Sequence, residues 1–213
     1  MKNSAGKPVL LKMVEMIQKN KDYLGEVDGL IGDGDHGMNM NKGFTLFRER
    51  IAEKDISFTQ GLGELGTLLF SQIGGSMGPI YGSIFTSMAE AGENCEVINA
   101  EGLAAMLEAG LQGLHEVVQG EVGDKTLVDT LVPANNALHK AVTEGKDLAK
   151  ALGEMKTAAE KGRDSTKDLV AKFGRSSRLG ERSRGVLDAG AVSCCIILSA
   201  IADGILEQSG VSV

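Results

Sequence analysis

Three aspartates near the start of the chain have the type and spacing of a metal site. Asp28, Asp33 and Asp35 fall within eight residues, on a backbone that carries glycine at positions 29, 32, 34 and 37. Carboxylates held this close repel one another strongly unless a cation lies between them. Their hard oxygen atoms suit Mg²⁺ or Ca²⁺ rather than zinc, and Mg²⁺ in proteins typically keeps phosphates and water as further ligands. The segment therefore predicts a divalent-cation site.

This acidic segment is not an EF-hand. A calcium loop that starts at Asp33 needs glycine at position 38 and glutamate at position 44, where the chain has Met38 and Phe44. A helix is expected to begin after Gly37, so that Asp35 caps it and the free amides of its first turn face any bound phosphate. The alternative is a turn with an N-cap aspartate and solvated acids, which does not need three acids and four glycines together.

Three further glycine-rich segments could contact a phosphate. Residues 74–82 form a turn that enters a helix and can present backbone amides, although a packed helix–helix corner explains it equally well. Residues 120–129 place Lys125 and Thr126 at a helix start without the sequence of a P-loop, and an N-capping turn alone explains Thr126. Residues 174–190 hold four arginines, which match phosphate oxygens, or else form a solvated basic loop. Together with the acidic segment they predict a site that grips a nucleotide polyphosphate through Mg²⁺ for phosphoryl transfer.

Two other patterns are set aside. Residues 61–66 satisfy G-x-G-x-x-G, but no strand precedes them, so a helical segment is expected there and not a dinucleotide site. The three cysteines, Cys95, Cys194 and Cys195, are an odd number without metal-ligand spacing, and we expect small core residues.

The elements that must position these residues are helices. Proline is scarce (3 of 213), aromatic residues make up 4%, and apolar residues recur at helical spacing, whereas no alternating strand pattern is visible. Short connections in a helical bundle bring successive loops to its two ends in turn. The sequence predicts an all-α, antiparallel bundle as a single domain over residues 1–213. Its eight expected helices cover residues 8–21, 37–54, 57–73, 78–92, 99–119, 127–145, 148–172 and 188–208.

Charge and apolar runs limit the partners. The net charge of −7 argues against nucleic acid and anionic membrane as partners. The longest uncharged apolar stretch, residues 189–202, has 14 residues where a bilayer needs about 20, so a buried helix is expected. The N-terminus shows no signal peptide, and a cytoplasmic location is expected.

Four motifs of the sequence resemble those of a known family. Residues 31–44 (Ile-Gly-Asp-Gly-Asp-His-Gly-Met-Asn-Met-Asn-Lys-Gly-Phe), residues 123–126 (Gly-Asp-Lys-Thr), residues 180–183 (Gly-Glu-Arg-Ser) and residues 188–191 (Asp-Ala-Gly-Ala) occur in the family's order. The chain resembles the nucleotide-binding L subunit of dihydroxyacetone kinase, which is also the C-terminal domain of single-chain dihydroxyacetone kinases. It departs from the family pattern at Met77, Leu127, Arg178, Arg184 and Ala189.

The resemblance implies an antiparallel eight-helix barrel with adenine nucleotide, ADP or ATP, at its rim. Asp28, Asp33 and Asp35 would be ligands of two Mg²⁺ ions that bridge the phosphates. No side chain of this chain is expected to act as a covalent catalytic group. The implied nucleotide-binding residues are His36, Gly37, Met38 and Asn39 for phosphate and ribose, Ser76 and Met77 beside the nucleotide, Gly120 and Leu127 toward the adenine, Arg175 on phosphate, and Asp188, Ala189 and Gly190 at the far wall.

The resemblance also implies partners. Family members of this length work with a K subunit that binds dihydroxyacetone and with a phosphocarrier M subunit fed by phosphoenolpyruvate, which rephosphorylates the tightly held ADP. The implied activity is thus a phosphotransferase that acts on dihydroxyacetone or a related short keto-sugar. The alternative is a non-catalytic, nucleotide-loaded regulatory module that binds a transcription factor, and the sequence leaves open whether the chain forms a homodimer.

Overall fold

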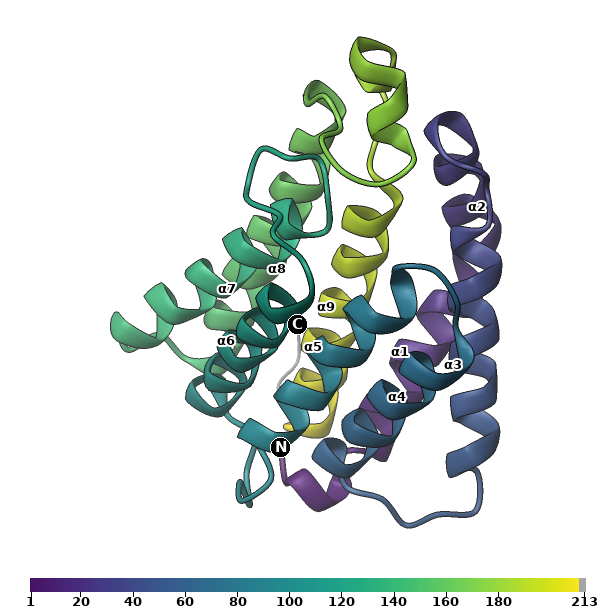
Figure 1. Ribbon diagram of the computed structural model, residues 1–213. Helices are drawn as coiled ribbons and strands as arrows, with labels where there is room; N and C mark the ends of the chain where they lie inside the picture. The colour runs from purple at the N-terminus through teal and green to yellow at the C-terminus, as the bar shows by residue number, and fades with distance from the viewer. Residues whose placement is uncertain (211–213) are drawn as a thin grey trace.

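Nine α-helices build the protein in the computed structural model, which describes residues 1–210 (Figure 1). Residues 211–213 of the expected 1–213 domain lie outside the described residues. Within that range there is no β-strand, only an isolated bridge between Lys2 and Val97, so the expected all-α class is confirmed. The α-helices are α1 (Lys7–Lys19), α2 (Lys21–Ile31), α3 (His36–Ile51), α4 (Phe58–Gln72), α5 (Met77–Ala91), α6 (Ala100–Val117), α7 (Val128–Thr143), α8 (Leu148–Ser165) and α9 (Ala189–Gln208). Short 3₁₀ segments are η1 (Asn3–Ala5), η2 (Thr166–Asp168) and η3 (Ser176–Ser183).

Helix α2 is absent from the eight expected ranges. Its buried residues Leu24, Val27 and Ile31 do follow a helical spacing. Gly25 and Gly29 lower the helix propensity of the segment, and tertiary packing overrides that preference. The correction matters for the site because the first aspartate of the acidic segment lies on a helix and not in a loop.

Several helices begin where the sequence offers an N-cap. Ser57 and Gln60 form a reciprocal capping box at the start of α4, and Asn99, Asp147 and Asp188 accept backbone N–H groups at the starts of α6, α8 and α9. Each such cap stabilises a helix by about 1 kcal/mol. The expected 148–172 helix is too long, because α8 ends at Ser165 and the chain then passes through η2.

Helix α9 lies in the core of the bundle. It is the one helix among residues 1–210 that is long and apolar enough to span a membrane, but 78% of its most apolar window is buried by the other helices. The expected buried helix is thus confirmed. Cys194 and Cys195 are buried on it, and Cys95 is half-buried elsewhere, with all three thiols free.

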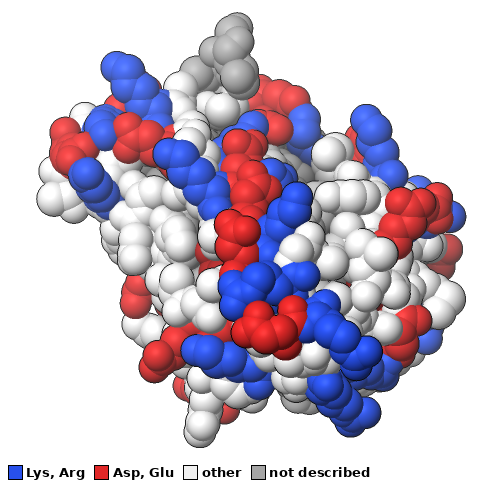
Figure 2. Space-filling model, turned by 90° about the horizontal axis from the view of Figure 1, so that it is seen from above, with Lys and Arg blue, Asp and Glu red and all other residues white. Residues whose placement is uncertain are grey.

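The connections that carry the glycine-rich segments gather toward one end of the bundle. The C-terminal end of α2, the α6–α7 connection and the segment between α8 and α9 lie in the upper part of Figure 1, and the start of α5 lies below them near mid-height. Figure 2 looks onto this end and shows acidic and basic side chains interleaved across it. By contrast, the G-x-G-x-x-G pattern at 61–66 lies inside α4, as expected.

Candidate functional site

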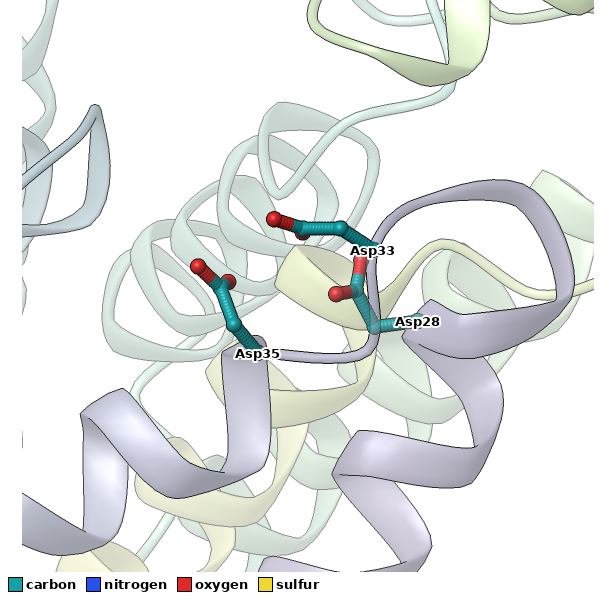
Figure 3. A group of neighbouring side chains, drawn as sticks. All are labelled: Asp28, Asp33 and Asp35. Carbon is teal, nitrogen blue, oxygen red and sulfur yellow. The ribbon is translucent and has the colours of Figure 1, made fainter.

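Three carboxylates converge where α2 passes into α3. Asp28 lies in the last turn of α2, Asp33 in the connecting turn and Asp35 directly before α3. One oxygen atom from each lies within 4.8 Å of the others (Figure 3). The structure therefore brings together the three residues that the sequence nominates as metal ligands. A set of oxygen donors at this separation suits Mg²⁺ or Ca²⁺.

The backbone of the α2–α3 turn fixes these side chains. Gly32 donates its N–H to the carbonyl of Asp28 at 2.6 Å, and His36 donates its N–H toward the Asp28 carboxylate at 3.4 Å. Asp35 occupies the N-cap position of α3, but its side chain accepts no capping hydrogen bond. The expected capping role of Asp35 is therefore wrong, because the carboxylate points toward the other two acids (Figure 3).

The carboxylates border a cavity of about 680 Å³. It lies at the end of the bundle where the glycine-rich segments meet, so residues distant in sequence share one wall. Thirteen of the fifteen nominated site residues line it: Asp28, Asp33, Asp35, His36, Asn39, Ser76, Met77, Gly120, Leu127, Arg175, Asp188, Ala189 and Gly190.

The two remaining nominated residues, Gly37 and Met38, do not line this cavity. Gly37 is buried against α2, where a Cβ atom would lie 1.9 Å from the carbonyl oxygen of Lys21. Met38 is 67% exposed and lies outside the cavity. The role of Gly37 in this structure is close helix packing, which a motif cannot distinguish from ligand contact.

An arginine from a distant part of the chain reaches the acidic cluster. Arg175, in the segment between α8 and α9, forms an ion pair with Asp33. Arg184 pairs with Glu181, whereas Arg178 and Arg182 have no ion-pair partner within residues 1–210. The alternative of a solvated basic loop thus describes part of this segment, and Arg175 is the arginine that faces the site.

A buried polar network lies beneath the carboxylates. The ring Nε2 of His36 is 2.8 Å from the Ser193 hydroxyl, which is 2.6 Å from the Tyr81 hydroxyl. These residues join α3, α9 and α5, and each is at most 8% exposed. Sequence reasoning missed Tyr81 and Ser193. Tyr81 stands within the second glycine-rich segment, but no local pattern links it to a serine 112 residues away.

The network should make the stability of the protein depend on pH. Burial lowers the pKa of His36 from 6.5 to about 4, partly offset by Asp28. Between these values the unfolded chain binds a proton that the folded chain does not, so the folded state loses stability as pH falls from 6.5 toward 4. We expect His36→Gln to abolish roughly 2 to 3 kcal/mol of this loss. Urea unfolding of both proteins in EDTA at pH 7 and pH 4.5 measures the difference.

A buried aspartate, Asp188, supplies a control whose effect on stability has the opposite pH dependence. Burial raises the pKa of Asp188 from 3.8 to about 6, while the Ala191 N–H and Lys125 act against the rise. Here the folded chain binds the extra proton, so stability grows as pH falls through 6 toward 4. Asp188→Asn should therefore increase the loss of stability at acid pH, whereas His36→Gln should reduce it. Equal pH dependence in the two variants would show that neither group titrates as its burial requires.

Comparison with known proteins identifies the family of the chain. The DAK2 domain family matches residues 30–203. The chain belongs to this family. It is 40% identical over 188 residues to the ADP-binding subunit DhaL of the PEP-dependent dihydroxyacetone kinase 1 of Listeria innocua, covering 88% of this chain and 89% of the relative. It is 35% identical to the DhaL subunit of the Escherichia coli enzyme, covering 91% and 92%.

Solved structures show the same fold. The dihydroxyacetone kinase of C. freundii matches with a TM-score of 0.70 at 20% identity, over 92% of this chain. The same enzyme in complex with AMP-PNP and Mg²⁺ matches with a TM-score of 0.66. This DAK2 chain spans about a third of that enzyme, 33% of its length. The expected family resemblance is confirmed, and the expected phosphotransferase agrees with the kinase subunits named among the relatives.

Proposed function

We propose that this DAK2 protein is the cytoplasmic nucleotide-binding subunit of a dihydroxyacetone-type kinase, with its whole length as one nucleotide-binding domain. It holds ADP or ATP at the cavity through two Mg²⁺ ions. The phosphoryl group passes from ATP to dihydroxyacetone or a related short keto-sugar on a separate K subunit. A phosphocarrier M subunit then rephosphorylates the retained ADP. The observation that carries the proposal is the convergence of three carboxylates at one end of a 680 Å³ cavity.

The charges around the cavity favour a polyphosphate. Bound Mg²⁺ supplies positive charge that neutralises phosphate oxygens as the phosphoryl group moves. Asp28, Asp33 and Asp35 are placed to hold it, and Arg175 adds a cation beside Asp33. The carboxylate set without an added cation would repel a nucleotide, so the same residues explain both metal dependence and phosphate binding.

The remaining walls suit the rest of a nucleotide. Gly74 and Gly75 enter the start of α5 beside Ser76, where open backbone can approach a phosphate closely. Leu127 and Val118 contribute apolar surface to the lining of the cavity, which suits an adenine ring. This chain needs no nucleophilic side chain, because the phosphoryl group passes directly from the nucleotide to the keto-sugar that the K subunit holds.

The proposal predicts that nucleotide remains with the protein through purification. We expect protein purified in Mg²⁺ and then denatured to release close to one adenine nucleotide per chain, identified as ADP by chromatography. Protein purified in EDTA should release far less, because the carboxylates cannot hold phosphate directly. Release of a non-adenine nucleotide, or equal retention in EDTA, would refute the assigned ligand.

Reconstitution separates catalysis from a purely regulatory role. With purified K and M subunits, phosphoenolpyruvate and the upstream phosphocarriers, the protein should support formation of dihydroxyacetone phosphate. Omission of this chain should abolish the product. Retained ADP with no transfer to dihydroxyacetone or to other short keto-sugars would instead favour a nucleotide-loaded regulatory module.

A further inference from the structure

Lys125 is a buried cation in the lining of the nucleotide cavity, and the proposed nucleotide chemistry assigns it no role. It belongs to the Gly-Asp-Lys-Thr motif between α6 and α7 and is 1% exposed. Its φ of 61° is the one positive value at a non-glycine residue among residues 1–210. A left-handed backbone is unfavourable for a non-glycine residue, and glycine would avoid that cost. The backbone conformation alone does not explain a lysine here, so the contacts of its side chain matter.

The Lys125 ammonium group donates hydrogen bonds to two main-chain carbonyls. These belong to Thr166, directly after α8, and to Val186, shortly before α9. A buried ammonium group is tolerated only where its donors are satisfied. The two carbonyls stand at the two ends of one segment, residues 166–186, so a single side chain joins the ends of that segment.

The rest of the motif also contacts the 166–186 segment. Asp124 pairs with the Lys172 ammonium at 2.6 Å, and its carbonyl accepts the Lys172 N–H at 3.2 Å. The turn itself is held by Asp129, which accepts N–H groups from Gly123 at 2.6 Å and from Thr126 at 2.8 Å. The α6–α7 connection thus contacts the 166–186 segment at its beginning, near its middle and at its end.

This segment carries Arg175, three residues beyond Lys172. Three further hydrogen bonds join its two arms to each other. The Gly185 N–H bonds the Lys167 carbonyl at 2.7 Å, the Ser183 hydroxyl accepts the Ala171 N–H at 2.9 Å, and the Arg184 guanidinium donates to the Asp168 carbonyl. Burial lowers the pKa of Lys125, while Asp188 and Asp129 favour its charged form. The position of Arg175 beside Asp33 therefore depends on how the ends of the segment are tied.

We propose that Lys125 is a positioning residue that closes the 166–186 segment into a fixed loop and thereby holds Arg175 over the phosphate site. The effect on nucleotide binding rests on the proposed function. The closure of the loop by the two Lys125 hydrogen bonds, called the tie below, does not. In this view the motif's lysine acts through the backbone of a distant segment and not as a phosphate ligand. The same tie also sets the approach of the chain into Asp188, whose N–H bonds the Thr166 hydroxyl at 3.0 Å.

The tie can be tested without nucleotide. Lys125→Met keeps the length of the side chain and removes its donors. We expect amide hydrogen exchange in residues 169–184 to accelerate at least about tenfold in this variant, with no change in α4 or α5. The matched control is Lys156→Met, which removes a half-buried ammonium paired with Asp203 at 2.5 Å between α8 and α9. Unchanged exchange in residues 169–184 would overturn the proposal and leave the proposed function untouched.

The consequence for the site is tested by a double-mutant cycle. We expect Lys125→Met and Arg175→Ala each to weaken Mg²⁺-dependent ADP binding about tenfold, and the double variant to bind little more weakly than either one. A merely structural lysine would give multiplied effects, about a hundredfold together, and would overturn the coupling. Failure of the unmodified protein to bind ADP at all would refute the proposed function instead, while the exchange experiment still decides the tie.

Two further variants keep the test decisive. Lys125→Gly removes the cost of the left-handed backbone, so weak ADP binding in this variant assigns the effect to the ammonium group. Binding as tight as in the unmodified protein would show that only the backbone turn matters and would overturn the proposal. Lys125→Gln retains amide donors on a shorter stem. It carries the cycle if the methionine variant does not fold, with the same coupling to Arg175→Ala expected at reduced size.

Discussion

Asp35→Asn should stabilise the protein in the absence of Mg²⁺ and weaken its binding of ADP in the presence of Mg²⁺. Asn keeps the shape of the side chain and removes one of three carboxylates whose oxygens lie within 4.8 Å. Without a cation this relieves repulsion, and we expect the free energy of unfolding to rise by about 1 kcal/mol. With Mg²⁺ and ADP the variant lacks a ligand, and we expect its affinity for ADP to fall roughly 100-fold or more. Urea unfolding in EDTA and calorimetric titration in Mg²⁺ measure the two effects.

Asp35 is the best of the three acids for this test. Asp33 already has a cation, because Arg175 pairs with it, and Asp28 accepts a hydrogen bond from the His36 N–H. Asp55→Asn is a matched control, since Asp55 is an exposed acid in the connection between α3 and α4. It should alter neither quantity by more than a few tenths of a kcal/mol. High salt should shrink the stability gain in EDTA, because it screens the repulsion.

An unaltered affinity for ADP in Asp35→Asn would remove the metal site from the proposed function. A loss of stability in EDTA would show that the carboxylate makes a favourable contact in the folded protein, such as the helix cap expected from sequence. The structure gives Asp35 no such bond. The sign of the change in EDTA therefore decides between a capping aspartate and a metal ligand, independently of any nucleotide.

The acidic cluster could be predicted from sequence because its physics is local. Three carboxylates on a short glycine-rich stretch repel one another wherever the chain goes, so their need for a cation does not depend on the fold. Most helices were also predictable, because apolar residues at 3.6-residue spacing mark a buried face. Helix α2 was not predicted, because its two glycines lower the helix propensity of the segment and packing against other helices supplies its stability.

Other parts of the site depend on contacts that no local pattern contains. Tyr81 and Ser193 meet 112 residues apart, and Lys125 reaches carbonyls 41 and 61 residues away. Each contact forms only after the connections at one end of the bundle have been brought together by the packing of the helices. The sequence therefore indicated which residue types the site contains, while their roles as ligands, ties or supports required the fold.

Gly37 shows how strongly such a contact can reverse an expectation based on local preference. Within a helix, glycine to alanine normally stabilises by roughly 0.5–1 kcal/mol. At Gly37, in the first turn of α3, the added Cβ would lie 1.9 Å from the Lys21 carbonyl oxygen and 2.7 Å from the Gly25 nitrogen. Both are backbone atoms of α2, which cannot move aside as a side chain can. We expect Gly37→Ala to destabilise the protein by about 3 kcal/mol, measured by urea unfolding.

Gly153→Ala provides the matched control. Gly153 lies within α8, and nothing lies within 4 Å of the position of its added Cβ, so the ordinary gain of roughly 0.5–1 kcal/mol is expected there. The two variants share a substitution and a helical backbone, and they differ in what stands opposite. Gly37→Ala should also reduce the thermal stabilisation by Mg²⁺ and ADP, because moving α3 from α2 separates Asp35 from Asp28. If Gly37→Ala were as stable as Gly153→Ala and kept its response to Mg²⁺, close packing of α2 on α3 would not be what holds the carboxylates together.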